Sequence, residues 1–330
     1  MVEGSAGAAA TERRQSLEAA SLATDVVDGL RRQPKQIPPF YLYDALGSQL
    51  FEAICELPWY PITRGECALL ARERDAILDR LDTPATLVEL GGGNGEKLAI
   101  LAEGFALAGR TADVHLIDIS ATALERACQT VARYGTVRVH GHRAEYAAGL
   151  REATARLEPN RSAMVLFLGS NIGNLHPDEA DRFVAEIREG LRPGDSFLLG
   201  ADLVKPEADL IIAYDDPLGV TAAFNRNLLV RLNRELDADF DVEQFTHQVV
   251  WNARRSRVES YLVSQADQTV CFREIDCCIR LDEGEGIWTE SSYKYGPEQI
   301  VDLGERAGFV RRAQWIEEET RFALTLFDVA

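Results

Sequence analysis

The chain has 330 residues, and 35 Lys and Arg stand against 53 Asp and Glu, which gives a formal net charge of −18. This length can bury a full core and allows one large domain with an insertion or two smaller domains. Because nucleic acids and anionic membranes bind basic surfaces, the acidic balance argues against both as partners. No run of 18 apolar residues occurs, so no transmembrane helix is expected.

The N-terminal residues and the cysteines indicate the cellular location. Residues 1–12 are mostly small, lack the order of a secretory signal, and predict a disordered tail. The six cysteines form no C-x-x-C pair and have no histidines at zinc spacing, so no metal site is expected. We interpret the adjacent Cys277 and Cys278 as thiols within a strand, in a reduced cytoplasmic protein.

The segment Leu87–Lys97 (LVELGGGNGEK) predicts a strand, a glycine turn and a helix in succession. Thr86–Leu90 has the composition of a buried parallel strand. The glycines that follow permit positive φ and let a ligand approach the backbone. By itself such a loop is a weak signal, since some loops of this kind are only tight turns.

The next predicted strand, Asp113–Ile119, indicates which ligand the loop binds. It ends with Asp118, about 25 residues after the loop, where a carboxylate can accept hydrogen bonds from ribose hydroxyls. The loop is not the G-x-G-x-x-G that encloses a pyrophosphate. Glu89 would repel a pyrophosphate but suits the ammonium group of a methionine moiety. The combination favours S-adenosylmethionine over NAD.

Helices and strands alternate through the first half of the chain, which predicts an open, doubly wound α/β sheet. Ligands of such sheets lie beyond the carboxyl ends of the strands, where the loop, Asp118, Glu145 and residues 169–174 are all expected. The remaining predicted elements are the helix Ala121–Tyr134 with Ser120 as N-cap, the strands Val137–His140, Ala163–Gly169 and Ser196–Ala201, and the helix Pro177–Leu191.

The second half differs, because its predicted strands alternate apolar and polar residues as antiparallel strands do. We therefore expect a largely antiparallel insertion, joined by the aromatic-rich residues before about 64. The expected elements are the helices Thr221–Leu236 and Pro297–Ala307, the strands Thr246–Ala253, Val258–Gln265 and Thr269–Leu281, and a last strand, Phe322–Phe327, that returns to the main sheet.

Three polar clusters have both a structural and a functional interpretation. Leu168–Leu175 (LGSNIGNL) is either a turn with Asx hydrogen bonds or part of a site. We expect Tyr214, Asp215 and Asp216 to open the long helix, and the two acids either cap that helix or bind a ligand. In Thr289–Tyr295 (TESSYKY), Glu290 and Ser292 point to one strand face, at an exposed edge or in a site.

These clusters carry a family resemblance. The segments YLYDALGSQLFEAICELPWYPITRGE, LVELGGGNGEK, FLGSNIGNL, AYDDPLGVTAAFNRNLLVRLNRELDADFD and WTESSYKY occur in order from about Tyr41 onward. They resemble the histidine N-alpha-methyltransferases of ergothioneine biosynthesis. The resemblance implies a class I S-adenosylmethionine-dependent methyltransferase fold with an inserted α+β substrate lobe. It also implies trimethylation of the histidine α-amino group to hercynine.

The resemblance assigns roles to individual residues. Asn174 and Tyr214 would hold the histidine carboxylate, and Tyr43 and the Gly169 carbonyl would face the amino group. The imidazole would be bound by Tyr60, Glu290 and Ser292. The residues implied for the cofactor are Gly91, Lys97, Asp118, Glu145 and Tyr146. Ser260 departs from relatives that have a larger apolar residue against the imidazole, which loosens one wall of the pocket.

Domain boundaries and alternatives complete the sequence hypothesis. We expect the substrate lobe in residues 13–64 and 203–294 and the methyltransferase domain in residues 65–202 and 295–330. The protein is expected to be a monomer that binds L-histidine. One alternative is an N-methyltransferase for another aromatic amine, such as a tryptophan derivative, which would not need Glu290. The other is a non-catalytic, methyltransferase-like regulatory subunit, which the intact motifs disfavour.

Overall fold

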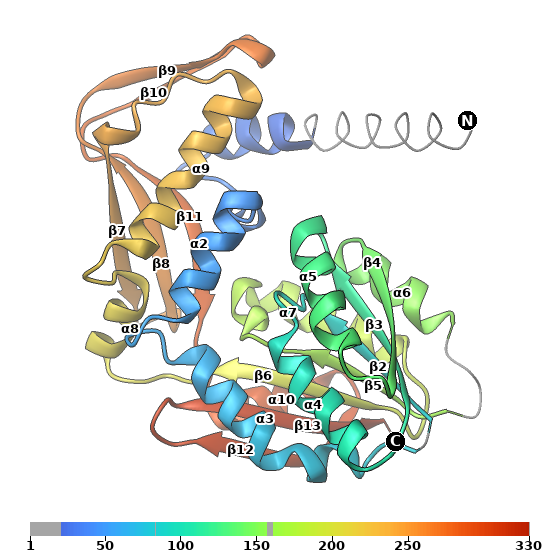
Figure 1. The fold of residues 1–330 in the computed structure, drawn as a ribbon. Coiled ribbons are helices and arrows are strands. Elements are labelled where there is room, and N and C mark those ends of the chain that lie inside the picture. The colour runs from blue at the N-terminus through green and yellow to red at the C-terminus, as the bar shows by residue number, and fades with distance from the viewer. Residues whose placement is uncertain (1–20, 83, 157–160, 330) are drawn as a thin grey trace, which may run out of the picture. The chain divides into compact units, whose positions relative to one another are not determined.

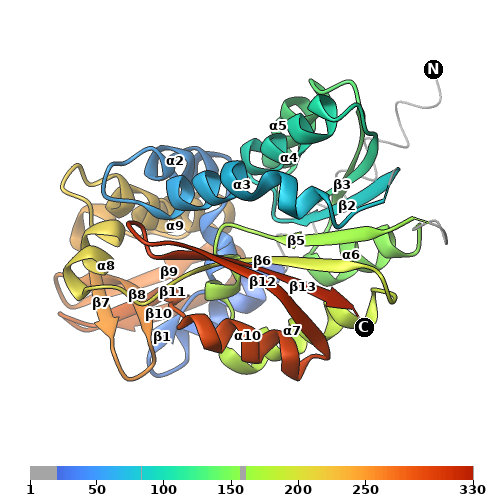
Figure 2. The same cartoon turned by 90° about the horizontal axis from the view of Figure 1, so that it is seen from below.

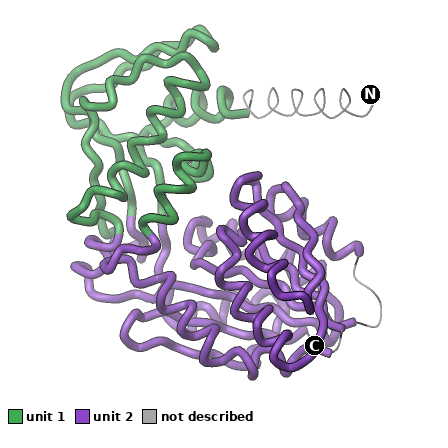
Figure 3. The backbone as a smooth tube through the Cα atoms, in the orientation of Figure 1, with its two compact units in different colours: residues 1–54, 214–251, 259–291 green, residues 55–213, 252–258, 292–330 purple. Residues whose placement is uncertain are grey.

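A computed structural model describes residues 21–82, 84–156 and 161–329 of the chain, so the predicted tail at 1–12 lies outside the described residues. The chain divides into two compact units (Figure 3). Unit 1 comprises residues 1–54, 214–251 and 259–291, and unit 2 comprises residues 55–213, 252–258 and 292–330. The main boundaries between the units thus lie after residues 54, 213 and 291. The sequence hypothesis placed them after residues 64, 202 and 294.

Unit 2 contains a seven-stranded sheet in the order β12-β13-β6-β5-β2-β3-β4. Strands β2 to β6 are parallel, and β13 pairs antiparallel with both β6 and β12. The order reverses beside β2, as in a doubly wound sheet. The strands are β2 (Ala85–Leu90), β3 (Ala112–Asp118), β4 (Val137–Arg143), β5 (Ala163–Phe167), β6 (Ser196–Asp202), β12 (Phe309–Glu317) and β13 (Phe322–Val329).

Helices cover both faces of this sheet (Figures 1 and 2). One face carries α3 (Ile62–Leu78), α4 (Glu96–Leu107) and α5 (Ala121–Ala132), and the other carries α6 (Tyr146–Thr154), α7 (Pro177–Glu189) and α10 (Pro297–Arg306). Every residue of β2 and β5 is buried, which explains their continuous apolar composition. The predicted strands of the first half, and the return of the last strand to the main sheet, are confirmed.

Local sequence signals account for the helix starts in unit 2. The Ser120 hydroxyl accepts a hydrogen bond from the Ala123 N–H, which confirms Ser120 as the N-cap of α5. Pro177 occupies the first turn of α7, and Glu179 reaches back to the His176 N–H at 2.9 Å, as in a capping box. Strand β12 and helix α6 were not predicted from the sequence.

Unit 1 is built on a four-stranded sheet in the order β1-β11-β8-β7, beside a separate β9–β10 hairpin. Strands β7, β8 and β11 begin or end in unit 2. The strands are β1 (Lys35–Gln36), β7 (Phe245–Asn252), β8 (Arg257–Ser264), β9 (Gln268–Phe272), β10 (Cys277–Leu281) and β11 (Gly286–Tyr293), and the longer helices are α2 (Ala45–Cys55) and α9 (Val220–Leu236).

The start of α9 corrects one prediction and shows a capping role for Asp216. Tyr214 ends a short helix, α8 (Glu207–Tyr214), and does not open the long helix. The Asp216 carboxylate accepts hydrogen bonds from the N–H groups of Leu218, Val220 and Thr221 at 2.7–3.2 Å. These donors lower the pKa of Asp216 although burial opposes the shift. Asp216 therefore caps α9.

The single strand predicted for Thr269–Leu281 is wrong. The structure has two strands there, β9 and β10, paired antiparallel. The one-turn 3₁₀ helix Arg273–Ile275 and Asp276, which has a φ of +46°, reverse the chain between them. Aspartate is one of the few residues that adopts this left-handed conformation at low cost. The apolar–polar alternation continues through the turn, so periodicity alone did not reveal the reversal.

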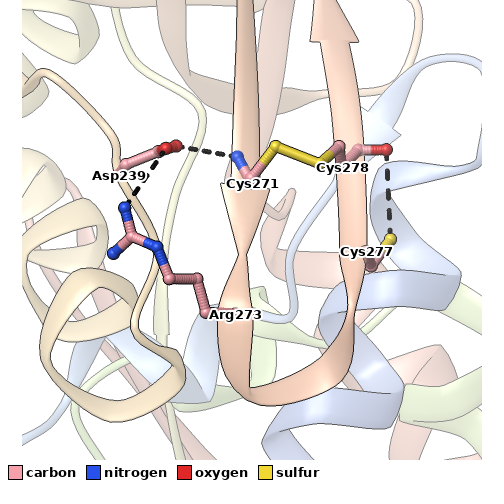
Figure 4. Close-up of a disulfide and its surroundings, with 5 residues drawn as sticks. All are labelled: Asp239, Cys271, Arg273, Cys277 and Cys278. Atoms are coloured by element: carbon pink, nitrogen blue, oxygen red, sulfur yellow. Dashed lines mark hydrogen bonds and ion pairs between the residues drawn. A yellow bond between two sulfur atoms is a disulfide. The ribbon is translucent and has the colours of Figure 1, made fainter.

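The prediction that Cys278 is a free thiol is also wrong. Cys278 lies opposite Cys271 in the hairpin register, with their Cα atoms 4.0 Å apart, and the two form a disulfide (Figure 4). Cys277 keeps a half-buried thiol. The pairing was missed because it requires the chain reversal at Asp276. Within the described residues, no helix is long and apolar enough to span a membrane.

Alkylation of the native protein without reductant tests this assignment. We expect Cys277 to be modified, whereas Cys271 and Cys278 remain in one cross-linked peptide and become reactive only after reduction. Peptide mass spectrometry gives the readout. Modification of Cys278 before reduction would show that the disulfide is absent.

Candidate active site

The loop between β2 and α4 is shaped by glycines. Gly91, Gly93 and Gly95 have φ values of 75°, 54° and 80°, a region in which other residues are strained. A Cβ at Gly91 would lie 2.6 Å from Tyr146 Oη, and one at Gly95 would lie 2.8 Å from Ala127 Cα. Among the described residues, no heavy atom lies within 4 Å of a Cβ built on Gly93. The loop is tightly packed at its ends and open in its middle.

Asp118 lies beside this loop at the carboxyl end of β3. Its Oδ1 accepts a hydrogen bond from the Ser120 N–H at 2.8 Å, and the Gly93 N–H bonds to the same carboxyl group. Burial raises the pKa of Asp118, although the N–H donors oppose this effect. The geometry places a hydrogen-bond acceptor at the position where the sequence predicted a ribose.

The start of α6 forms another side of this region. Tyr146 packs edge-on against Phe167, with ring centroids 5.4 Å apart, and tilted against Phe183 at 5.8 Å. Burial raises the pKa of Tyr146, so its phenol is neutral at physiological pH. Glu145 is the exposed N-cap residue of α6 but makes no side-chain capping bond.

A buried ion pair lies below the loop. The Glu66 carboxylate, with none of its residue surface exposed, accepts from the Gly169 N–H at 2.8–2.9 Å and pairs with Lys97 Nζ at 2.8 Å. Burial opposes the charge of Lys97, but Glu66 outweighs it and raises the pKa of Lys97. A Cβ at Gly200 would lie 2.0 Å from Glu66 Oε1, so a larger residue at this point of β6 would displace the carboxylate.

Glu89 is a second buried carboxylate at the loop. Its residue is 1% exposed, and within the described part of the chain its Oε2 has no hydrogen-bond partner. Burial raises the pKa of Glu89 to about 7, although Lys97 lowers it. A buried carboxylate with an unsatisfied oxygen is costly, and a bound cation would remove that cost.

These features fit S-adenosylmethionine. Asp118 offers an acceptor for ribose hydroxyls, and Glu89 offers a buried anion for the methionine ammonium. The open middle of the glycine loop leaves room for a ligand to approach the backbone of the loop. Among the described residues, no group of three or more His, Cys, Asp and Glu side chains could hold a metal ion.

The polar segment after β5 folds into a short 3₁₀ helix, Asn171–Asn174. Gly169 and Ser170 precede it with φ values of 76° and 56°. A Cβ at Gly173 would lie 2.7 Å from the backbone oxygen of Tyr293, so this segment packs directly on the end of β11. Asn174 is partly exposed at the end of the turn.

Ser292 lies at the end of β11, next to a buried charge network. Lys294 Nζ is 2.9 Å from Ser292 Oγ and 2.9 Å from Asp202 Oδ2. Lys205 Nζ lies 2.6 Å from the other carboxylate oxygen of Asp202. The Asp202 N–H donates to Ser170 Oγ at 2.9 Å, which connects this network to the segment after β5.

Tyr60 belongs to unit 2, and three further predicted substrate residues belong to unit 1. Tyr60 is buried, and its backbone oxygen accepts from Arg64. The Tyr43 ring packs edge-on against Phe51 and Phe224, each with centroids 5.4 Å away. Tyr214 is buried, and its carbonyl is 2.9 Å from His247 Nε2. Glu290 is in β11, which confirms that it shares a strand face with Ser292.

Sequence reasoning missed two groups of this region. Glu66 and Lys294 both lie within the quoted segments, WYPITRGE and WTESSYKY, but neither received a role. The signal available was a charged residue next to residues that are buried here, because a buried charge almost always has a partner. Their partners, Gly169 and Asp202, come from distant parts of the chain.

Comparison with known proteins identifies the family. A protein family described as "Histidine-specific methyltransferase, SAM-dependent" matches residues 22–329. The histidine N-alpha-methyltransferase of Mycobacterium tuberculosis is 38% identical over 307 residues, which cover 93% of this chain and 94% of that protein. Ergothioneine biosynthesis protein 1 of Neurospora crassa is 29% identical over 308 residues, 92% of this chain and 34% of that protein.

A third relative has a different amino acid in its name. The L-tryptophan methyltransferase of Psilocybe serbica is 26% identical over 335 residues, which cover 92% of this chain and 91% of that protein. With the strand order of unit 2, the family match confirms the predicted class I methyltransferase fold.

The Asp118→Ala variant tests the predicted ribose position. Ribose hydroxyls would lose a charged acceptor worth about 1.5–3 kcal/mol per bond, so we expect S-adenosylmethionine to bind roughly 10- to 100-fold more weakly. Isothermal titration gives the affinity, and an unchanged melting temperature controls for misfolding. An affinity equal to that of the wild type would remove Asp118 from the site.

The pKa of Glu89, about 7, predicts a pH-dependent affinity. A cation bound beside Glu89 favours its ionised form, so affinity should rise from pH 5.5 to 7.5, roughly tenfold for each unit by which the cation lowers this pKa. The stability of the free protein should change oppositely. Because the folded pKa exceeds the unfolded value, the contribution of protonated Glu89 is present at low pH and lost as pH rises through about 7.

Titration with S-adenosylhomocysteine, which carries the same amino acid group, measures this affinity across the pH range. The Glu89→Gln variant is the control, since its affinity should no longer depend on pH in this interval. Equal pH dependence in both proteins would assign the effect to another group.

Proposed function

The chain belongs to the family of histidine-specific, S-adenosylmethionine-dependent methyltransferases, and we propose that it methylates the α-amino nitrogen of L-histidine three times. The product is hercynine, and the reaction is the first step of ergothioneine biosynthesis. The observation that carries this proposal is the family match over residues 22–329. The names of the relatives from Mycobacterium tuberculosis and Neurospora crassa support the substrate and the pathway.

The proposed cofactor site uses residues at the carboxyl ends of β2 and β3. Asp118 would bind the ribose, Glu89 the methionine ammonium, and Lys97 the methionine carboxylate. Gly91, Glu145 and Tyr146 would line the same site. Lys97 is already paired with Glu66, so the ligand carboxylate would share this ammonium with a buried acid.

The proposed substrate site follows the family roles. Asn174 and Tyr214 would hold the carboxylate of histidine, while Tyr43 and the Gly169 carbonyl would face its amino group. Tyr60, Glu290 and Ser292 would bind the imidazole, directly or through water. The Gly169 N–H donates to both carboxylate oxygens of Glu66, which holds the backbone at this residue. This contact supports the role of Gly169, because its carbonyl must be held in position. In this scheme unit 1 is the main substrate lobe and unit 2 the methyltransferase domain.

The chemistry requires positioning more than acid–base catalysis. S-adenosylmethionine, when bound, supplies an electrophilic methyl group on its sulfonium. In each transfer a nitrogen–carbon bond forms as the sulfur–carbon bond breaks, so orientation supplies much of the acceleration. A free amino group is largely protonated at pH 7 and must lose a proton before it attacks. The Tyr43 hydroxyl and the Gly169 carbonyl would orient the lone pair, and solvent would take the proton.

The proposal includes a setting for the reaction. The protein would act in the cytoplasm as a monomer on small molecules, without nucleic acid or membrane. The net charge of −18 supports the exclusion of both polyanions. Size-exclusion chromatography with light scattering checks the oligomeric state.

A second candidate is N-methylation of tryptophan or a related aromatic amine. Two observations favour it: the relative from Psilocybe serbica and the small side chain of Ser260, which is 3% exposed on β8. Glu290 opposes it, because an indole would not need a carboxylate at this position.

One incubation separates these functions. The protein is mixed with S-adenosylmethionine and either histidine or tryptophan, and products are followed by mass spectrometry. We expect trimethylated histidine and little methylated tryptophan. Absence of any methylated product, with cofactor binding intact, would favour the regulatory subunit.

The Glu290→Ala variant tests the substrate assignment. We expect a loss of kcat/KM for histidine of at least about tenfold, since an interaction with a charged group is worth about 1.5–3 kcal/mol, and little change in affinity for S-adenosylhomocysteine. Asp118→Ala serves as the converse control, since it should lower cofactor affinity first. The assignment fails if Glu290→Ala keeps wild-type kinetics or loses both ligands equally.

A further inference from the structure

His247 is a buried histidine that the proposed function leaves without a role. It lies on β7, and its residue is 7% exposed. Its Nε2 is 2.9 Å from the carbonyl oxygen of Tyr214, and its Nδ1 is 2.8 Å from Asn225 Nδ2. All three residues belong to unit 1. The imidazole thus joins a helix side chain to the backbone of a residue with a proposed substrate role.

The two contacts fix where the hydrogen of His247 is. A carbonyl oxygen only accepts, so Nε2 must carry a hydrogen and donate it to Tyr214. Asn225 Nδ2 also lies 3.2 Å from the carbonyl oxygen of Tyr261, which identifies it as the donor end of the amide. It therefore donates to Nδ1 of His247 as well. Burial lowers the pKa of His247, although the bond to Tyr214 opposes this shift. His247 is consequently neutral, with its hydrogen on Nε2.

Ordinary capping of a helix end does not explain this arrangement. Tyr214 is the last residue of α8, and carbonyls at helix ends commonly bond to water. Here a buried imidazole and a buried amide serve one carbonyl instead. Asn225 is 2% exposed, and its Oδ1 has no hydrogen-bond partner among the described residues. An unsatisfied buried acceptor is costly, so the bond to Tyr214 is maintained at the expense of stability.

The backbone at Tyr214 is held a second time, two residues later. The Asp216 carboxylate accepts from the Thr221 N–H at 2.7 Å and so fixes the start of α9. Tyr214 therefore lies in a segment that is anchored at its own carbonyl and again at Asp216. A ligand-binding residue needs such support, because its contacts tolerate displacements of only about 0.5 Å.

We propose that His247 is a positioning residue that holds Tyr214 in place for the substrate carboxylate, and so favours an amino acid over its decarboxylated amine. This inference rests on the proposed function, in which Tyr214 holds the carboxylate of histidine. His247 acts through the backbone of Tyr214 and does not contact the substrate. Loss of its bond should weaken binding of the carboxylate and leave binding of the imidazole and the amino group unchanged.

Two substitutions of His247 form a matched pair. The short amide of His247→Asn reaches the position of Nδ1, where its oxygen accepts from Asn225, but it does not extend to the Tyr214 carbonyl. The longer amide of His247→Gln places a nitrogen near the position of Nε2 and still donates. We expect His247→Asn to raise the KM for histidine about 3- to 10-fold, the value of one hydrogen bond, with little change in kcat. His247→Gln should give a smaller rise.

Two controls separate positioning from a general structural effect. Histamine has the imidazole and amino group of histidine without the carboxylate, so its inhibition constant should be the same for wild type and His247→Asn. Asn233→Ala removes bonds of 2.8–2.9 Å to the carbonyl and N–H of Phe240, also in unit 1, and neither bond involves Tyr214. Asn233→Ala should lower the melting temperature and retain the KM for histidine.

A double-mutant cycle tests whether His247 acts through Tyr214. In Tyr214→Phe the hydroxyl that His247 positions is absent, so adding His247→Asn should raise the KM for histidine little further. If His247→Asn does not fold, NMR of wild-type protein labelled with 15N-histidine replaces it. With S-adenosylhomocysteine bound, the Nε2–H signal of His247 should shift more on addition of unlabelled histidine than on addition of histamine.

Four outcomes would overturn the proposal while leaving the proposed function intact. They are an equal loss of affinity for histidine and histamine in His247→Asn, an equal rise in KM in Asn233→Ala, additive effects in the cycle, and equal NMR shifts with both ligands. Failure of the proposed function is distinct, because wild-type protein would then form no methylated histidine.

Discussion

The buried carboxylate of Glu66 is the constraint on which the carboxyl-end edge of the main sheet depends. It comes from α3, yet it binds the Gly169 N–H after β5 and the Lys97 ammonium from α4. It also lies against Gly200 on β6, where a larger residue would displace it. One charged group thus fixes four separate elements. If Glu66 were removed, Lys97 would lose its partner, and losing one member of a buried ion pair is strongly destabilising.

The buried charges near the glycine loop do not balance. Two buried carboxylates, Glu66 and Glu89, accompany the single ammonium of Lys97, and Glu89 Oε2 has no partner within the described residues. A protein interior tolerates such an imbalance poorly. A ligand with a positive charge reduces this excess of negative charge. The buried carboxylates and the use of a cationic methyl donor are therefore connected.

The second network is centred on the buried carboxylate of Asp202. Here two ammonium groups, those of Lys205 and Lys294, share one carboxylate. Because an ammonium only donates hydrogen bonds, the Ser292 hydroxyl and the Thr320 carbonyl accept in their contacts with Lys294 and Lys205. Both networks lie in unit 2, and both contact the segment that runs from Gly169 into the 3₁₀ helix Asn171–Asn174. That segment is thereby held from two sides.

The sequence by itself determined the alternation of strands and helices, the glycine loop and the position of Asp118. These follow from local periodicity and from the chemistry of single residues, and the structure has them at nearly the predicted positions. Tertiary structure alone decided the β9–β10 hairpin with its disulfide, the pairing of Glu66 with Gly169 and Lys97, and the contact of Lys294 with Ser292 and Asp202. Glu66 is 103 residues from Gly169, and no local pattern reports which distant backbone group will face a buried charge. The type of a residue determines which hydrogen bonds or ion pairs it needs when buried, but only the packed chain supplies the partner.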